Sequence, residues 1–291
     1  MNILILGGSG QVGFELQRSL ATLGPITAPT RTELDLTNPK AVADYLEQAQ
    51  PDLIANAAAW TAVDAAEEHK EEAYRLNAGL PEQVARFAAE QGVLLVHYSS
   101  DYVYPGNGTE PWQETSPTGP LSVYGQTKLE GDQAIQHSGA KHLIFRTSWV
   151  YSARGNNFMK TMLRLAATKP ELNIVADQIG APTPARLIAQ ITSMAIQSDI
   201  PGGRYHLAPN GETSWHSFAQ EIFRFAQEHD QQLTMGPDTA HGIPTNDYPT
   251  PAKRPLNSRM NLAKLETALN IRLPNWKAQL ELTLGEYLED K

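Results

Sequence analysis

The chain has 291 residues, a formal net charge of −9 and no cysteine. This length suffices for one large domain or two unequal ones, and the acidic balance argues against a nucleic-acid partner, which needs a basic face. The lack of cysteine excludes disulfides, thiol catalysis and cysteine-ligated metal sites, and it fits a reducing compartment. No apolar run is long enough to cross a membrane and no basic leader precedes Ile3, so we expect a cytoplasmic protein without a membrane partner.

In the first half of the chain, short apolar runs alternate with segments of helical periodicity. The run Ile3–Leu6 is followed by a segment that places Val12, Leu16 and Leu20 on one helical face. Continuous apolar strands separated by helices indicate an α/β fold, a doubly wound parallel (Rossmann) sheet covered on both faces. In chain order we expect strands at 3–6, 26–28, 53–58, 93–98 and 142–146, and helices at 11–23, 39–48, 67–77, 81–91 and 122–137.

Glycines at positions 7, 10 and 13 lie between the first strand and the first helix. Gly7 and Gly10 allow a tight turn and a close backbone approach to a diphosphate, and Gly13 lets the helix pack on the sheet. A glycine-rich turn without a ligand is the alternative, but the position directly after an apolar strand favours a dinucleotide-binding turn.

The residues after the second strand indicate the type of cofactor, because they meet the adenosine ribose in dinucleotide folds. Arg31 stands there and favours NADPH, since an arginine accommodates the 2′-phosphate. A solvated surface charge is the alternative reading, so NADH stays open. Asp35 follows, next to Leu36, and its carboxylate can accept a hydrogen bond from the adenine amino group.

Tyr124 and Lys128 are four residues apart, so a helix places both on one face. A nearby ammonium favours the phenolate and lowers the tyrosine pKa, so such a pair can protonate a carbonyl oxygen as hydride reaches the carbon. Ser100 and Asp101 follow the strand 93–98, and ligands of open α/β sheets bind at the carboxyl ends of strands. Ser100 is therefore predicted to hydrogen-bond the reacting oxygen; the alternative is that Ser100 or Asp101 caps the next segment.

The second half of the chain is richer in proline and glycine connections. We expect helices at 158–168, 185–197, 215–229 and 276–288, and an extended loop at 243–255, which carries four prolines. Arg254 in this loop suits a bidentate contact with a nucleotide diphosphate, with a solvated arginine as the alternative. The predicted division is a dinucleotide-binding domain at 1–150 plus about 176–202 and a smaller, loop-rich α/β substrate domain at about 151–175 plus 203–291.

The glycine turn, Ser100 and the Tyr124/Lys128 pair together resemble the extended short-chain dehydrogenase/reductase superfamily. Within it, further strings resemble the dTDP-4-dehydrorhamnose reductase family. This resemblance implies NADPH-dependent reduction of the 4-keto group of dTDP-4-dehydro-L-rhamnose to dTDP-L-rhamnose, with hydride from nicotinamide C4. The matching strings run nearly end to end, at 56–59, 61–64, 100–104, 124–131, 146–151, 177–183, 205–206, 214–215 and 254–258.

The resemblance also implies a role for each matching residue. Tyr124 is the implied proton donor, Lys128 the partner that tunes it and binds the ribose, and Ser100 keeps a hydroxyl where this family often has threonine. The remaining implied contacts are Gly10, Gln11 and Val12 with the diphosphate, Asp35 and Leu36 with the adenosine, Ala59, Trp60 and Thr61 with the far end of the cofactor, and Asp101 and Trp149 with the sugar.

Some members of the family bind magnesium at a dimer interface through three glutamates. Glu15 and Glu286 match two of these, but Arg186 stands at the third position. A cation in place of a ligand carboxylate is incompatible with a divalent metal. We therefore expect no metal, an ion pair between Arg186 and the remaining carboxylates, and a monomer or weak dimer.

Two other functions remain open at this point. An epimerase or dehydratase acting on another nucleotide sugar would use the same residues but keep its cofactor tightly bound. A non-catalytic, NADP-binding regulatory subunit is the second alternative, because the regulatory subunit of methionine adenosyltransferase resembles this same family. The intact set of Ser100, Tyr124 and Lys128 argues against the regulatory reading.

Overall fold

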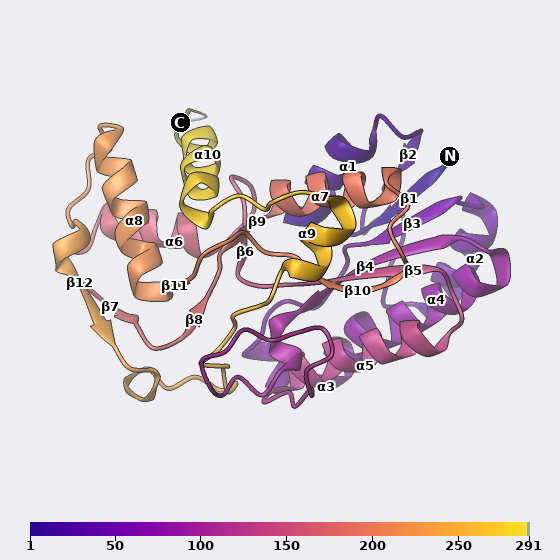
Figure 1. Cartoon of the computed structure of the whole chain (residues 1–291), viewed down its shortest axis with the longest axis horizontal. Coiled ribbons are helices and arrows are strands. Elements are labelled where there is room, and N and C mark those ends of the chain that lie inside the picture. Colours follow the sequence, from indigo (N-terminus) through magenta and orange to yellow (C-terminus); the bar gives the residue numbers. More distant parts are fainter. Residues whose placement is uncertain (290–291) are drawn as a thin grey trace.

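The computed structural model describes residues 1–289 and has a six-stranded sheet at its centre (Figure 1). The strand order is β10-β5-β4-β3-β1-β2, and every neighbouring pair is parallel. This confirms the predicted doubly wound parallel sheet. The strands are β1 (Ile3–Leu6), β2 (Ile26–Thr27), β3 (Leu53–Asn56), β4 (Leu94–Ser100), β5 (His142–Thr147) and β10 (Gly203–His206).

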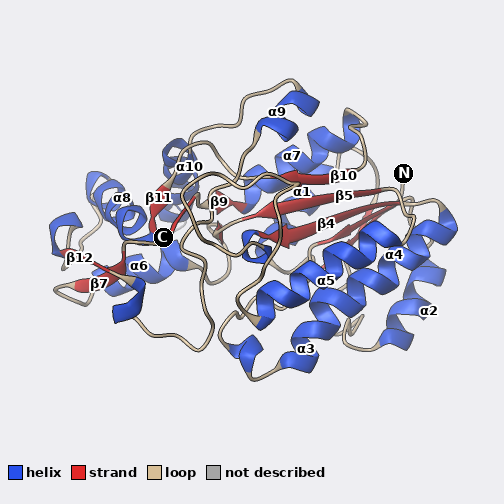
Figure 2. Ribbon diagram, turned by 60° about the horizontal axis from the view of Figure 1, so that its bottom comes forward, coloured by secondary structure: helices blue, strands red, loops and turns tan. Residues whose placement is uncertain are grey.

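Helices cover both faces of the sheet (Figure 2), which explains why its strands are apolar without interruption. Successive strand residues point to opposite faces. In β1, Ile3 and Ile5 pack into one core cluster and Leu4 and Leu6 into the other. One face is covered by α1 (Gln11–Leu20) and α7 (Ala185–Gln197), the other by α2 (Pro39–Ala49), α4 (Leu80–Gln91) and α5 (Val123–His137).

The single helix predicted at 67–77 is wrong in detail. The segment consists of a 3-10 turn (Ala65–Glu67), the short helix α3 (Lys70–Tyr74) and a π turn (Arg75–Gly79) that runs into α4. Pro81 explains the wide turn, because it lacks the N–H that would close an α-helical hydrogen bond on the carbonyl of Asn77.

A second group of elements packs around its own apolar core, away from the main sheet (Figure 1). Helix α8 (Trp215–Glu228) is amphipathic, and its Phe218, Ile222 and Phe223 are fully buried in this core. No helix within residues 1–289 is long and apolar enough to cross a membrane. The group comprises α6 (Phe158–Ala166), α8 (Trp215–Glu228), α10 (Trp276–Glu289) and short strand pairs, β7 (Leu172–Val175) with β12 (Ala240–Ile243), β8 (Ile179–Gly180) with β11 (Thr213–Ser214), and β6 (Val150–Tyr151) with β9 (Thr183–Pro184).

Two late segments return to the main sheet. β10 pairs with β5 at the sheet edge, and Leu265 and Leu269 of α9 (Ala263–Leu269) pack into the core under α1 and α7. Packing therefore places residues 203–206 with the central sheet, whereas the predicted division puts them in the substrate domain. The division into two domains stays a prediction.

Candidate active site

The chain reverses direction across the sheet between β1 and β3. From β1 the chain builds outward to β2, and from β3 it builds the other way to β4, β5 and β10. Open α/β sheets bind ligands in the crevice at the carboxyl ends of two such strands. The glycine turn follows β1 and the segment from Ala57 to Thr61 follows β3, so both predicted cofactor-binding segments lie at this crevice.

The glycine turn has the backbone that its sequence predicts. Gly7 has φ +81°, and a Cβ there would lie 2.7 Å from the Ala58 nitrogen. A Cβ on Gly13 would collide with the Gly7 carbonyl oxygen. Gly10 precedes α1, and no side chain caps this helix end. The free N–H groups that begin α1, including those of Gln11 and Val12, form a cradle that fits a diphosphate.

The segment from Ala59 to Thr61 is held by Asn77 of the π turn. The Asn77 side chain accepts from the Trp60 amide at 2.9 Å and donates to the Trp60 carbonyl at 3.1 Å. It also donates to the Thr127 hydroxyl on α5 at 3.2 Å. Asn77 was missed from the sequence, because its position depends on a turn that helical periodicity does not predict.

The residues predicted to meet the adenosine lie after β2, at the surface. Arg31 and Asp35 are exposed, and Leu36 packs partly into the core beneath α2 and α4. Asp35 accepts hydrogen bonds from the Thr37 hydroxyl at 2.7 Å and the Thr37 amide at 2.9 Å. These bonds hold the pKa of Asp35 below its ordinary value, and the charge of Arg31 lowers it further.

Ser100, the last residue of β4, meets Tyr124 in the first turn of α5. Burial raises the pKa of the Tyr124 phenol, and the nearby Ser100 hydroxyl is the main opposing effect. Ser100 also accepts from the Tyr102 amide at 3.2 Å and donates to Asp101 at 3.0 Å, so the capping alternative is present as well. The Tyr124 ring lies edge-on to Tyr102, with centroids 5.4 Å apart.

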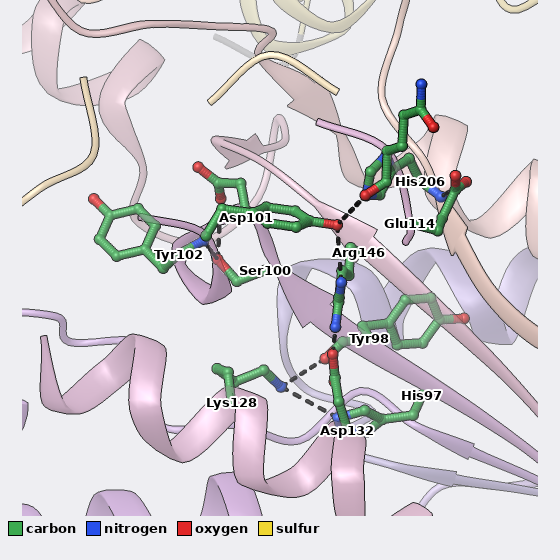
Figure 3. Close-up of polar contacts among 12 residues, drawn as sticks. His97, Tyr98, Ser100, Asp101, Tyr102, Glu114, Lys128, Asp132, Arg146 and His206 are labelled. Atoms are coloured by element: carbon green, nitrogen blue, oxygen red, sulfur yellow. Dashed lines mark hydrogen bonds and ion pairs between the residues drawn. The ribbon is translucent and has the colours of Figure 1, made fainter. Parts of the chain in front are cut away.

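Lys128 lies one turn beyond Tyr124 and is 1% exposed. Its ammonium donates to the Tyr98 carbonyl at 2.6 Å, and Nζ lies 3.3 Å from His97 Nε2 (Figure 3). Burial lowers the pKa of Lys128 to about 8, and the charge of Asp132 opposes this effect. Burial is the larger effect on the Tyr124 phenol and holds its pKa above the ordinary value, so the lowering expected from the ammonium stays a prediction.

The predicted sugar residues Asp101 and Trp149 follow the carboxyl ends of β4 and β5. Asp101 is 2% exposed, and burial raises its pKa to about 6. Trp149 has φ +49°, a strained value for a bulky residue, and its ring stacks on Trp215 with centroids 3.7 Å apart. Trp215 donates to the buried Gln178 at 3.1 Å and packs against the second apolar core, so it links Trp149 to that core.

Arg254 sits in the proline-rich segment, which contains a short 3-10 turn (Thr245–Asp247). Its guanidinium donates to Asp64 at 2.7 Å and to the Tyr102 hydroxyl at 3.2 Å. The Ala252 amide also bonds to Asp64, at 3.2 Å. Arg254 is thus neither freely solvated nor remote, since it fastens this segment beside the Tyr102–Tyr124 pair.

The predicted ion pair at the third glutamate position is confirmed. Arg186 on α7 lies 2.7 Å from Glu286 on α10 and 3.7 Å from Glu15 on α1. Within the described part of the chain, no three His, Asp or Glu side chains are grouped so that they could hold a metal ion.

A buried polar network behind the site was not predicted. Arg146 on β5 and Asp132 on α5 are both fully buried and form an ion pair at 2.9 Å. Arg146 also donates to the Tyr104 hydroxyl at 2.8 Å. This hydroxyl oxygen lies 2.6 Å from His206 Nε2 (Figure 3). A charged residue directly after the apolar run 143–145 of β5 is the signal that could have revealed it.

The chain matches the family model described as the RmlD substrate binding domain over residues 1–289. It is 48% identical to a dTDP-4-dehydrorhamnose reductase of Shigella flexneri, with 98% of each chain covered. Its structure is similar to that of a dTDP-4-dehydrorhamnose reductase of Clostridium acetobutylicum, at TM-score 0.90 and 36% identity, covering 99% of this chain and 100% of the other. It is also similar to the Bacillus anthracis reductase solved in complex with NADP, at TM-score 0.89 and 32% identity, covering 100% and 99%.

Proposed function

Because the chain belongs to the RmlD substrate binding domain family, we propose that it is an NADPH-dependent oxidoreductase that reduces dTDP-4-dehydro-L-rhamnose to dTDP-L-rhamnose. The observation that carries the proposal is that the glycine turn, Ser100, Tyr124 and Lys128 come together where the parallel strands have their carboxyl ends. The NADP complex of the similar Bacillus anthracis reductase supports the choice of cofactor.

The residues of the crevice fit a dinucleotide. The glycine turn and the start of α1 would hold its diphosphate, Arg31, Asp35 and Leu36 its adenosine end, and Ala59 to Thr61 and Lys128 its nicotinamide end. When bound, the cofactor supplies a hydride. The backbone collisions that a Cβ would cause at Gly7 and Gly13 explain why glycine stands at these positions.

Tyr124 acts as the proton donor to the reacting oxygen. Since burial raises its pKa, the phenol is neutral near pH 7 and carries the proton that the developing alkoxide requires. Ser100 would turn its single hydroxyl hydrogen from Asp101 to the reacting oxygen and so give that oxygen a second hydrogen bond. Both groups are fixed before the reaction, Ser100 by the Tyr102 amide and α5 by its capping residue Ser122.

The sugar and its diphosphate would bind against the opposite wall. Asp101 is placed for hydrogen bonds to the sugar, and the Trp149 ring gives an apolar surface held by Trp215. Arg254 is assigned to the nucleotide diphosphate, for which it would exchange its contact with Asp64.

The test is cofactor oxidation with dTDP-4-dehydro-L-rhamnose, with identification of the product. We expect substrate-dependent oxidation of NADPH that yields dTDP-L-rhamnose. Protein that carries bound NAD and turns over another nucleotide sugar without net oxidation would support the epimerase or dehydratase instead. Protein that binds cofactor but acts on no nucleotide sugar, and co-purifies with a synthetase, would support the regulatory subunit.

Replacing Arg31 by serine should change cofactor preference. A hydrogen-bonded charge contributes about 1.5–3 kcal/mol, so losing a contact with the 2′-phosphate should lower kcat/KM for NADPH by about tenfold or more. The value for NADH should stay nearly constant, since NADH has no 2′-phosphate. Arg164→Ser, at an exposed position of α6, is the matched control and should change neither value. An equal effect on both cofactors would contradict the role of Arg31.

A further inference from the structure

A line of three buried polar side chains runs from β3 to α5 beside the proposed cofactor crevice. Asn56 and Lys128 are each 1% exposed, and His97 between them is fully buried. Asn56 Nδ2 lies 3.2 Å from His97 Nδ1, and His97 Nε2 lies 3.3 Å from Lys128 Nζ. Figure 3 shows the Lys128 ammonium in contact with both the His97 ring and the Tyr98 carbonyl. The function proposed above uses Lys128 but leaves Asn56 and His97 unassigned.

The Ala58 amide fixes the orientation of the Asn56 side chain, and Asn56 in turn fixes the tautomer of His97. The Ala58 amide is a donor and meets the Asn56 side chain at 3.2 Å, so the atom facing it is the oxygen. The Asn56 NH₂ group then faces His97 and donates to Nδ1. A neutral imidazole with an acceptor at Nδ1 carries its hydrogen on Nε2. Burial and the charge of Lys128 hold the pKa of His97 well below its ordinary value, so the ring stays neutral.

The Nε2–H group consequently faces Lys128. An ammonium has three donors and no acceptor, so two donors oppose each other across 3.3 Å when Lys128 is charged. A neutral amine has a lone pair and accepts this hydrogen bond while still donating to the Tyr98 carbonyl. We propose that His97 is a positioning residue which, held by Asn56 in the Nε2–H tautomer, directs a donor at Lys128 and favours its neutral form.

The other charged groups near Lys128 act in the opposite direction or are engaged elsewhere. On α5, Asp132 favours the ammonium, but its charge is shared with Arg146 of β5. Tyr124 is a neutral phenol. On the segments packed over the outer side of α5, Glu67 accepts from the Val123 amide and Arg75 donates to Thr37 and Gln83.

The consequence for the proposed reductase, on whose function this inference rests, is a lysine that changes charge close to the working pH. An acid–base group is most effective when its pKa lies near that pH. A charged Lys128 favours the phenolate of Tyr124 after proton transfer, and a neutral Lys128 does not. Reduction should therefore decline as pH rises through the Lys128 pKa.

The tautomer of His97 can be read in the unsubstituted protein and without substrate, with one variant needed only to assign the signals. In protein labelled with ¹⁵N-histidine, the resonances of His97 should show hydrogen on Nε2 and a free lone pair on Nδ1. The signals are assigned by their loss in His97→Gln. Hydrogen on Nδ1 would overturn the proposal.

The ionisation of Lys128 gives the second readout. In protein labelled with ¹³Cε-lysine, with the signal assigned by its loss in Lys128→Met, we expect a midpoint near the value of about 8 that burial produces. His97→Gln lets an amide oxygen turn toward the ammonium, so the midpoint should rise by about one pKa unit, a tenfold change in the ionisation constant. An unchanged midpoint in a folded variant would overturn the proposal.

The matched control is His137→Gln, the same substitution at an exposed position of α5, which should leave the midpoint unchanged. In the reductase assay, the alkaline decline of kcat/KM should move to higher pH in His97→Gln by the same amount as the midpoint. If the protein reduces no 4-keto sugar, the proposed function fails while the two spectroscopic readouts still decide the role of His97.

Discussion

Tyr124→Phe should lose most of the reductase activity and keep the fold and cofactor affinity. The substitution removes one hydroxyl and retains the ring that packs edge-on against Tyr102. A positioned general acid contributes about 10²- to 10⁴-fold, so kcat/KM should fall by about that factor. The lost group is the hydroxyl beside Ser100, whereas the glycine turn and the start of α1 are untouched. NADPH affinity, measured by fluorescence titration, should therefore change little.

Tyr102→Phe is the matched control for this experiment. It removes a hydroxyl from the neighbouring ring, one that accepts from Arg254 and whose pKa burial raises to about 12. Its effect should appear mainly in KM for the nucleotide sugar, because Arg254 is assigned to the substrate and not to proton transfer. If Tyr124→Phe retained full activity, or if both variants lost activity equally, Tyr124 would not be the proton donor.

The sequence predicts best those strands whose side chains are all buried and those helices that follow a regular apolar period. β1, β3 and most of β4 are buried on both faces, so their apolar runs stand out from any neighbouring segment. The helices over the sheet follow apolar periodicity, and Asn38 caps α2 where the pattern begins. β10 was missed because Gly203, Arg204 and His206 give it no apolar run; it forms because β5 offers a free edge.

The same distinction applies to the candidate site: local motifs could be predicted from the sequence, and contacts between distant segments could not. The glycine turn and the Tyr124/Lys128 spacing are local patterns, so they can be found without knowing which segments meet. Asn56, His97 and Asn77 act through partners that are 41, 31 and 50 residues away, and no local pattern contains those contacts. Arg254 is an intermediate case. Its residue type predicted a contact with a nucleotide diphosphate, whereas its partner in the structure is the carboxylate of Asp64.

Asp132→Asn should destabilise the fold more than any other single change of charge considered above. Asp132 and Arg146 are fully buried, and removing one partner of such a pair leaves an uncompensated charge at a cost of about 3–5 kcal/mol. Arg146 would retain only neutral acceptors, the new amide oxygen and the Tyr104 hydroxyl. That hydroxyl is shared with a neutral His206, because burial and Arg146 lower the His206 pKa to about 3. Urea unfolding should report this loss.

The matched control for Asp132→Asn is Asp44→Asn. That change breaks an ion pair with Lys40 of similar length, 2.6 Å, on α2, where the two side chains are 63% and 82% exposed. An exposed pair contributes less than about 1 kcal/mol, so the two variants differ by burial and not by chemistry. Asp132→Leu with Arg146→Met should recover stability relative to Asp132→Asn, because the unpaired charge is gone. Equal losses of unfolding free energy in Asp132→Asn and Asp44→Asn would mean that water reaches Arg146. The polar network around Arg146 would then not be excluded from solvent, contrary to what the packing of β5 against α5 indicates.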